Sequence, residues 1–89
     1  MAKEYRLVPS KLFLKDLEKL PADIKPRVEK TLLELKKDPH STPNIKKLRN
    51  VDIGEWRLRI GDWRLRYDVV GNDILLHIIR QRKDVYKNK

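Results

Sequence analysis

The chain has 89 residues, no cysteine and a net charge of +9, from 22 Lys plus Arg against 13 Asp plus Glu. This length predicts one domain spanning residues 1–89, and the lack of cysteine excludes disulfides and thiolate metal sites. With no apolar run near the roughly 18 residues of a membrane span and no signal-peptide pattern, we expect a soluble, cytoplasmic protein without a membrane partner. The basic balance indicates a polyanionic partner, most often nucleic acid.

The first half of the chain predicts one strand and two helices. Residues 4–8, EYRLV, alternate as a short strand. Ser10 is a suitable N-cap for a helix to about Lys19. A second helix is expected over about residues 22–37, with Pro26 in its first turn, where a missing N–H does little harm. Apolar residues recur at helical spacing in both segments, which predicts an antiparallel helical hairpin that covers a sheet.

The second half predicts a loop followed by three strands. The loop spans residues 40–54, and the strands are expected at about 55–60, 63–70 and 74–80, with Gly-Asp and Gly-Asn turns. The resulting order is β-α-α-β-β-β, an α+β fold with a helical hairpin on one face of a mostly antiparallel sheet. The tail RKDVYKNK either forms a helical turn or stays irregular.

Arginine is concentrated in the second half. Up to residue 44 there are eight Lys and two Arg, whereas from residue 45 onward there are five Lys and seven Arg. In EWRLRIGDWRLRYDVV, residues 55–70, a two-residue turn at Gly61-Asp62 would set Arg59 opposite Arg64 and Arg57 opposite Arg66. The apolar residues between them, Trp56, Trp63 and Tyr67 included, would then lie on the other side and pack in the core.

Two interpretations of the four arginines are open. The first is a plain solvated face, in which the arginine stems cover apolar surface. Opposed like charges destabilise a sheet by up to about 1 kcal/mol per pair, so such a face would be more stable with mixed charges. We therefore favour a solvent-facing surface that binds phosphate. The position of Arg80 is also open, because a two-residue Gly-Asn turn sets it beside Trp63 and a three-residue Gly-Asn-Asp loop sets it beside Arg64.

The segments KKLRN, EWRLRIGDWRLRYDVV and ILLHIIRQRKDVY resemble the RelE/ParE toxin superfamily of prokaryotic toxin–antitoxin systems. The similarity extends over nearly the whole chain and implies the β-α-α-β-β-β fold and a cognate antitoxin that wraps around the toxin. RelE-like members cleave messenger RNA in the ribosomal A site, and ParE-like members poison DNA gyrase. For a RelE-like protein, the resemblance implies that the ribosome, with its mRNA and rRNA, is a further partner and that no small-molecule cofactor is needed.

Carried onto this sequence, the resemblance implies catalytic roles for Arg64, Arg82 and Tyr86, with Arg80 as a shifted alternative to Arg82. Many relatives carry histidine at the position of Gln81, so a histidine-based mechanism is not expected here. The remaining basic residues are expected to bind RNA or phosphate: Arg57, Arg59, Arg66, Arg80, Lys46, Lys47 and Arg49. For the last three, a plain solvated loop is the alternative.

Metal-free RNA cleavage by a 2′-hydroxyl needs a base, charge stabilisation at the phosphate and an acid for the leaving oxygen. The sequence has no spacing typical of a metal site, and His77, in mid-strand, is expected to be a hydrogen-bonded structural residue. Arginine does not give up its proton usefully, so the arginines should neutralise phosphate. Tyr86 is either the base, because positive charge favours its phenolate, or a stacking platform. The favoured prediction is therefore a RelE-like, ribosome-dependent messenger RNA endonuclease held inactive by its antitoxin. The alternatives are a ParE-like DNA gyrase inhibitor without nuclease activity and a non-catalytic RNA-binding domain.

Overall fold

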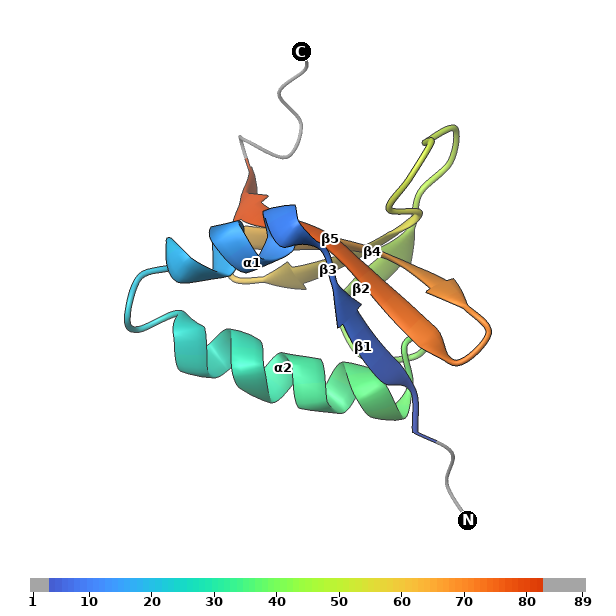
Figure 1. The fold of residues 1–89 in the computed structure, drawn as a ribbon, viewed down its shortest axis with the longest axis horizontal. Coiled ribbons are helices and arrows are strands. Elements are labelled where there is room, and N and C mark those ends of the chain that lie inside the picture. Colours follow the sequence, from blue (N-terminus) through green and yellow to red (C-terminus); the bar gives the residue numbers. More distant parts are fainter. Residues whose placement is uncertain (1–3, 83–89) are drawn as a thin grey trace.

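The computed structural model describes residues 4–82. Its elements, in chain order, are β1 (Arg6–Pro9), α1 (Lys11–Glu18), α2 (Lys25–Lys37), β2 (Ile45–Lys47), β3 (Trp56–Ile60), β4 (Trp63–Val70) and β5 (Asp73–Gln81). The strands form one sheet in the order β1-β5-β4-β3-β2, in which β1 runs parallel to β5 and the other neighbours are antiparallel. The predicted α+β class with two helices and a mostly antiparallel sheet is confirmed (Figure 1).

The short strand β2 was not predicted, because it lies inside the segment that we expected to be a loop. It follows Asn44, which has a left-handed backbone with φ of 72°. Ile45 lies opposite Leu58 and packs against the core, which holds this strand to the edge of β3. Three residues are too few for an alternating pattern to stand out in the sequence.

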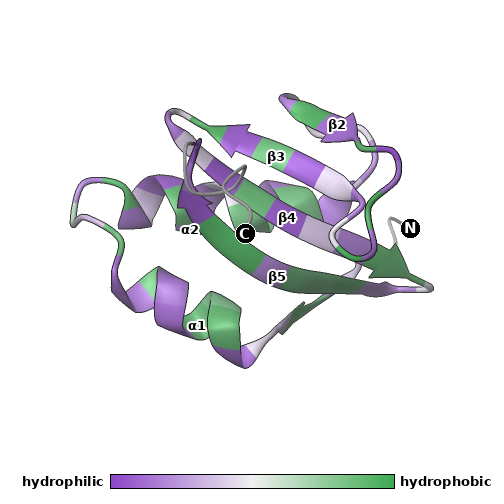
Figure 2. Ribbon diagram, turned by 90° about the horizontal axis from the view of Figure 1, so that it is seen from above, coloured by the Kyte–Doolittle hydropathy of each residue, from purple (hydrophilic) through white to green (hydrophobic). Residues whose placement is uncertain are grey.

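The two helices take different positions relative to the sheet. α2 lies behind the sheet, whereas α1 lies beside β5 (Figure 2). The Ser10 hydroxyl accepts a hydrogen bond from Phe13 N at 2.9 Å, which confirms it as the N-cap, and donates one to His77 O at 2.9 Å. The buried Asp16 carboxylate accepts a hydrogen bond from Ile79 N at 3.2 Å. α1 thus satisfies backbone groups of β5 beyond the end of β1, which protects this edge from further strand pairing.

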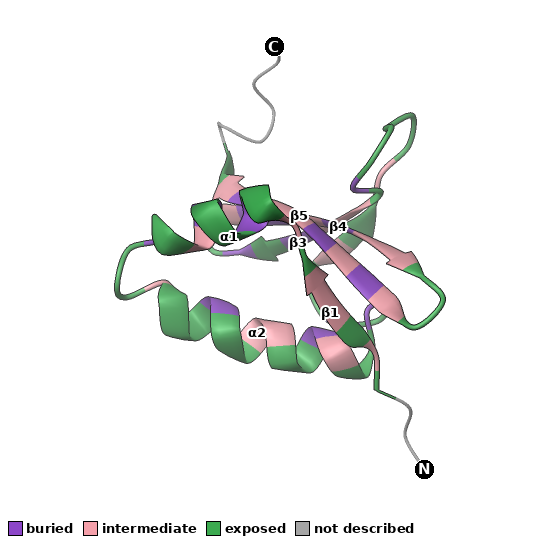
Figure 3. Ribbon diagram, in the orientation of Figure 1, coloured by how far each residue is buried: buried purple, intermediate pink, exposed green. Residues whose placement is uncertain are grey.

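The hydrophobic core lies between the helices and the inner face of the sheet, where Figure 3 shows the buried segments. Tyr67 is fully buried, and its hydroxyl donates a hydrogen bond to Pro39 O at 2.7 Å. Burial, with a smaller contribution from the Asp38 carboxylate, raises the pKa of Tyr67. Trp56 stacks on Tyr67 with ring centroids 6.4 Å apart, and Trp63 is half-buried against the core. The predicted inward side of the β3–β4 hairpin is therefore confirmed.

The register between β3 and β4 is the predicted one. Arg59 lies opposite Arg64 and Arg57 opposite Arg66, around a turn in which Gly61 has φ of 61°. Between β4 and β5 the turn has two residues, since Val70 pairs with Asp73.

A β-bulge at His77 then shifts the register of β5 by one residue. Arg66 pairs with Ile78 while the next residue, Tyr67, pairs with Leu76. Arg80 therefore lies opposite Arg64, the outcome that we had linked to a longer loop. No helix within residues 4–82 is long and apolar enough to cross a membrane.

Candidate nucleic-acid interface

Five arginines occupy neighbouring register positions on the sheet face away from α2, and we call this surface the arginine face. Its members come from the three central strands: Arg57, Arg59, Arg64, Arg66 and Arg80. Figure 2 shows this face toward the viewer, with hydrophilic positions alternating along β3 and β4. The apolar residues between the arginines point into the core. The alternation of period two thus separates charge from core on each strand.

Arg64 is more buried than predicted. Its exposed fraction is only 6%, so the expectation of four solvent-facing guanidinium groups is wrong at this position. The physical reason is that the side chain folds over the turn, where Nη1 donates hydrogen bonds to Gly61 O at 3.0 Å and Trp63 O at 3.2 Å. Its buried Nε has no hydrogen-bond partner in the described part of the chain. Such a donor costs about 1–3 kcal/mol, and unpaired buried donors are rare in native proteins.

Arg80 and Arg82 lie at the same end of the sheet as Arg64. Arg80 Nε donates a hydrogen bond to Asp16 Oδ2 at 3.2 Å, which fixes the guanidinium beside α1. The backbone N–H of Arg82 bonds to Asp62 O at 2.8 Å, so the β4–β5 ladder continues to the turn. Arg82 is exposed. Arg82 directly follows the last residue of β5, and its backbone bond to Asp62 brings a further arginine next to the Gly61-Asp62 turn.

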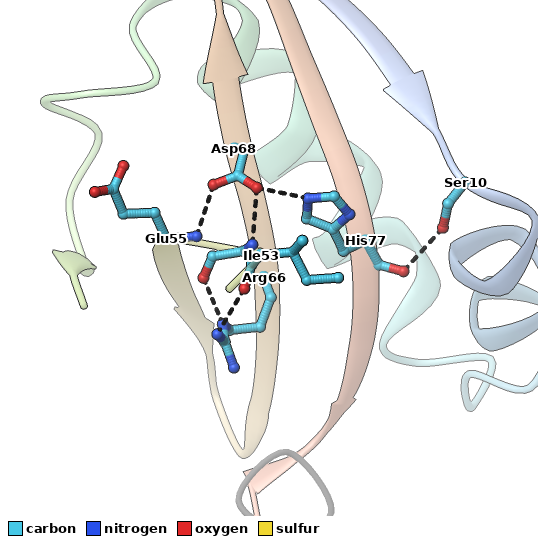
Figure 4. A network of polar contacts seen from close by, with 7 residues as sticks. Ser10, Ile53, Glu55, Arg66, Asp68 and His77 are labelled. Atoms are coloured by element: carbon cyan, nitrogen blue, oxygen red, sulfur yellow. Dashed lines mark hydrogen bonds and ion pairs between the residues drawn. The ribbon is translucent and has the colours of Figure 1, made fainter. Parts of the chain in front are cut away.

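Arg66 lies at the opposite end of the arginine face and takes part in a different structure (Figure 4). Its Nε donates to Gly54 O at 2.7 Å and its Nη2 to Ile53 O at 3.1 Å. On the same strand, the Asp68 carboxylate accepts the N–H groups of Gly54 at 2.8 Å and Glu55 at 2.7 Å. We call Arg66, Asp68 and His77 the loop clamp, because together they hold the segment that leads into β3. Phosphate binding by Arg66 stays a prediction, with two of its nitrogens already engaged.

His77 completes the loop clamp from β5. Its Nε2 lies 2.8 Å from Asp68 Oδ2, so the prediction of a hydrogen-bonded structural histidine is confirmed. Burial alone would raise the pKa of Asp68, but the hydrogen bonds from Glu55 N, Gly54 N and His77 together lower it below its ordinary value. The carboxylate therefore stays charged in the folded protein.

Gly54 is the loop residue that the loop clamp contacts most closely, since it bonds to both Asp68 and Arg66. Its φ is 69°, and a Cβ at this position would lie 3.0 Å from Arg66 Cβ and 3.2 Å from Arg66 Nε. Both the left-handed backbone and the close approach of Arg66 favour glycine. No pattern in the sequence signals this contact beyond a single acidic residue, Asp68, in an arginine-rich strand.

The remaining predicted site residues divide between the two sides of the sheet. Lys46 is exposed and lies opposite Arg57, at a register position on the arginine face. Lys47 lies opposite Trp56, with Nζ 3.7 Å from Glu55 Oε2 and 5.8 Å from the centroid of the Trp56 ring. The structure therefore places Lys47 away from the arginine face.

The other two predicted residues lie beyond the sheet. Arg49 is exposed in the β2–β3 segment, which rises on the side away from α2 (Figure 1). Tyr86 lies outside the described residues. Sequence reasoning missed Arg27 of α2, whose Nη1 would lie 3.5 Å from a Cβ at Gly61 and which brings positive charge to the turn. Among residues 4–82 no group of three His, Cys, Asp or Glu side chains is arranged to hold a metal ion.

Fold and site together define a small α+β protein with a basic sheet face and a core-packed helical pair, the architecture of a toxin of the RelE/ParE superfamily. A family model described as the ParE toxin of the type II toxin–antitoxin system parDE matches residues 7–86. The chain belongs to this family and is thus a toxin of a type II toxin–antitoxin system. A search of curated proteins gave no significant match.

Solved structures support the same assignment. The chain is similar to the RelE–RelB complex of Methanococcus jannaschii, with 27% identity, a TM-score of 0.73 and coverage of 89% of this chain and 94% of that chain. It is also similar to the archaeal RelE–RelB complex of Pyrococcus horikoshii, with 25% identity, a TM-score of 0.76 and coverage of 90% and 97%. The RelBE2 complex of Mycobacterium tuberculosis shares the fold, at 24% identity, a TM-score of 0.77 and coverage of 90% and 100%.

Proposed function

We propose that this toxin is a ribosome-dependent messenger RNA endonuclease that cleaves without a metal ion. The single observation that carries the proposal is Arg64, a nearly buried arginine whose Nε has no acceptor among the described residues, beside the exposed Arg59. If the Arg64 side chain rotates so that Nε reaches the surface, an RNA phosphate would supply the missing acceptor, and its charge would offset the repulsion between opposed arginines.

In the proposed reaction, the 2′-oxygen of one nucleotide attacks the adjacent phosphorus and the bond from phosphorus to the 5′-oxygen breaks. The products carry a 2′,3′-cyclic phosphate and a 5′-hydroxyl. Arg59, Arg64 and Arg82 would neutralise the charge that builds up on the phosphate oxygens. Tyr86 would take the 2′-hydroxyl proton as its phenolate, and a water molecule would protonate the leaving oxygen. Because the arginines cannot act as proton donors, the ribosome must supply much of the rate by orienting the substrate.

The proposed partners are a cognate antitoxin, which holds the toxin inactive, and the ribosome with its messenger RNA. The structures from M. jannaschii and P. horikoshii are complexes of RelE with RelB, which supports an antitoxin partner for this chain. A net charge of +9 supports a nucleic-acid target, because neutralised phosphates release counterions.

The test is induction of the toxin in cells, followed by primer-extension mapping of transcripts. Codon-phased cuts inside translated regions are expected. The variants Arg64→Ala and Arg82→Ala should abolish both the cuts and growth arrest while keeping the circular dichroism spectrum of the wild type. Full toxicity of both variants, with transcripts intact, would refute the nuclease proposal.

A second candidate is inhibition of DNA gyrase, favoured by the match to the ParE family model. In that case messages stay uncut, and the purified toxin blocks supercoiling of a relaxed plasmid by gyrase. The same two experiments also test the remaining alternative, a non-catalytic RNA-binding domain, which would show neither cleavage nor gyrase inhibition.

A further inference from the structure

A cavity of about 310 Å³ opens between α1 and the turn end of β4 and β5. Its lining is Asp16, Lys19, Trp63, Ile79, Arg80 and Gln81. The volume lies at the lower end of the range for small-molecule sites, which suits a single ring system better than a larger ligand. The cleavage chemistry proposed above does not use this cavity, because Arg80 is the only lining residue that belongs to the arginine face.

The polar groups of the cavity are complementary to the edge of a nucleobase. Asp16 is 9% exposed, and both of its hydrogen bonds, from Ile79 N and Arg80 Nε, use Oδ2. Oδ1 accepts no hydrogen bond from residues 4–82, so it can accept one from an amino group in the cavity. Lys19 and Arg80 supply donors for ring nitrogens and carbonyls. The indole of Trp63 supplies an aromatic surface on which a base can stack.

Arg80 is the wall that the cavity shares with the arginine face. Arg80 is the register partner of Arg64 on the neighbouring strand. Its Nε donates to Asp16, and its terminal nitrogens remain available to an anion. A phosphate bound between Arg64 and Arg80 would therefore stand next to the cavity mouth. A nucleotide attached to that phosphate has its base within reach of Trp63.

We propose that this cavity binds one base of the RNA strand whose phosphate lies on the arginine face, and that Asp16 selects bases carrying an exocyclic amino group. Adenine, cytosine and guanine each carry an amino N–H that can be donated to a carboxylate, and acidic side chains accept such a bond from cytosine in duplex recognition. Uracil has no amino group. Its N3–H lies between two carbonyl oxygens, and these oxygens are repelled by the carboxylate. The proposal rests on the proposed function in one respect, that the ligand is RNA.

The competing explanation is that Asp16 only supports the fold, by satisfying Ile79 N and pairing with Arg80. Loss of that support would weaken all RNA binding equally. It would not change the order in which the protein binds different bases, and this order is therefore the informative measurement.

The first experiment measures binding of fluorescent eight-nucleotide oligo(A), oligo(C) and oligo(U) by anisotropy, without ribosomes and at one fixed ionic strength. For the wild type we expect oligo(A) and oligo(C) to bind about fivefold tighter than oligo(U) or better. Asp16→Asn, which keeps an acceptor oxygen but loses the charge, should reduce this ratio below twofold. Glu18→Gln is the matched control, since Glu18 is exposed on the same helix and does not line the cavity.

The second experiment leaves Asp16 intact and reads the cavity directly. Trp56→Phe leaves Trp63 as the one tryptophan of the two in the chain. Oligo(C) should quench the emission of Trp63 at concentrations where oligo(U) does not. Arg59→Ala in the same background should weaken binding of both oligonucleotides by a similar factor.

The outcomes separate the two proposals. RNA binding that Arg59→Ala weakens, with equal base ranking in the wild type and Asp16→Asn and no quenching of Trp63, overturns the cavity proposal and leaves the RNA target standing. Absence of RNA binding by the wild type at low salt, with gyrase inhibition instead, overturns both. Base ranking lost only in Asp16→Asn supports the cavity proposal.

Discussion

Replacing Asp68 with asparagine should destabilise the protein far more than the same change at the sheet's other paired aspartate, Asp73. The Asp68 carboxylate accepts two backbone N–H groups, from Gly54 at 2.8 Å and Glu55 at 2.7 Å, and contacts His77 at 2.8 Å. Asparagine keeps one acceptor oxygen, and its amide NH₂ must then face a backbone N–H. The loss of one charge-assisted hydrogen bond predicts a cost of about 2 kcal/mol, or a Tm lower by roughly 8–16 °C.

The assay is urea unfolding at pH 7, followed by tryptophan fluorescence, with the free energy of unfolding obtained by linear extrapolation. Asp73→Asn is the control, because Asp73 pairs with Arg6, whose side chain is 75% exposed. Exposed ion pairs contribute little, so this variant should unfold close to the wild type. Equal destabilisation of the two variants would refute the loop clamp as a stabilising structure.

The pH dependence of the stability difference between wild type and Asp68→Asn provides a second test of the loop clamp. The pKa of Asp68 is lowered in the folded protein, so its stabilising contribution is present above the ordinary value of 3.8 and is lost as the pH falls through the lower folded value. The gap between the free energies of unfolding of wild type and Asp68→Asn should therefore be full at pH 7 and should shrink as the pH falls below 3.8 through the lower folded pKa. A gap that stays constant over this range would show that the charge of Asp68 is not what holds the loop.

Three further predictions follow from single contacts. Gly54→Ala should lower the free energy of unfolding by about 1–2 kcal/mol for its left-handed backbone, plus a further penalty for crowding Arg66. This loss should exceed that of Gly71→Ala, where φ is 61° but no atom lies within 4 Å of the added Cβ. Urea unfolding of both variants measures the difference. Tyr67→Phe should lower the free energy of unfolding by about 1 kcal/mol at pH 7, because the hydroxyl bond to Pro39 is lost. The raised pKa of Tyr67 makes the wild type lose stability as the pH rises above 10.0. The stability difference between the two proteins should therefore narrow in alkaline unfolding followed by circular dichroism. Arg66→Lys should lower the free energy of unfolding, because lysine cannot bond to both loop carbonyls. Arg59→Lys should leave the free energy of unfolding near that of the wild type and weaken RNA binding, as urea unfolding and anisotropy would report.

The β3–β4 hairpin was predictable because its determinants are local. A two-residue turn and a period of two fix which residues oppose each other, and the pairs of Arg59 with Arg64 and Arg57 with Arg66 follow without any tertiary information. The helix start at Ser10 was equally local, since one side chain caps the first turn.

The position of Arg80 was not predictable, because the bulge at His77 depends on distant contacts. Its side chain bonds to Asp68 on the neighbouring strand, and its carbonyl accepts a hydrogen bond from Ser10 at the start of α1. These partners are 9 and 67 residues away in the chain, and no pattern within β5 reveals them. The residue types gave the surface its charge, but packing against α1 decided which arginines stand together.

The same distinction explains why equal arginines have unequal roles along one face. Guanidinium groups bind carbonyl oxygens as readily as phosphate, so their role depends on which acceptor the fold brings near. Next to the loop, Arg66 meets the carbonyls of Ile53 and Gly54 and becomes a structural residue. At the turn end, Arg64 meets two carbonyls with one nitrogen and leaves its buried Nε unpaired. We therefore expect an anion to bind where the fold supplies too few acceptors, at the Gly61-Asp62 turn rather than beside the loop clamp.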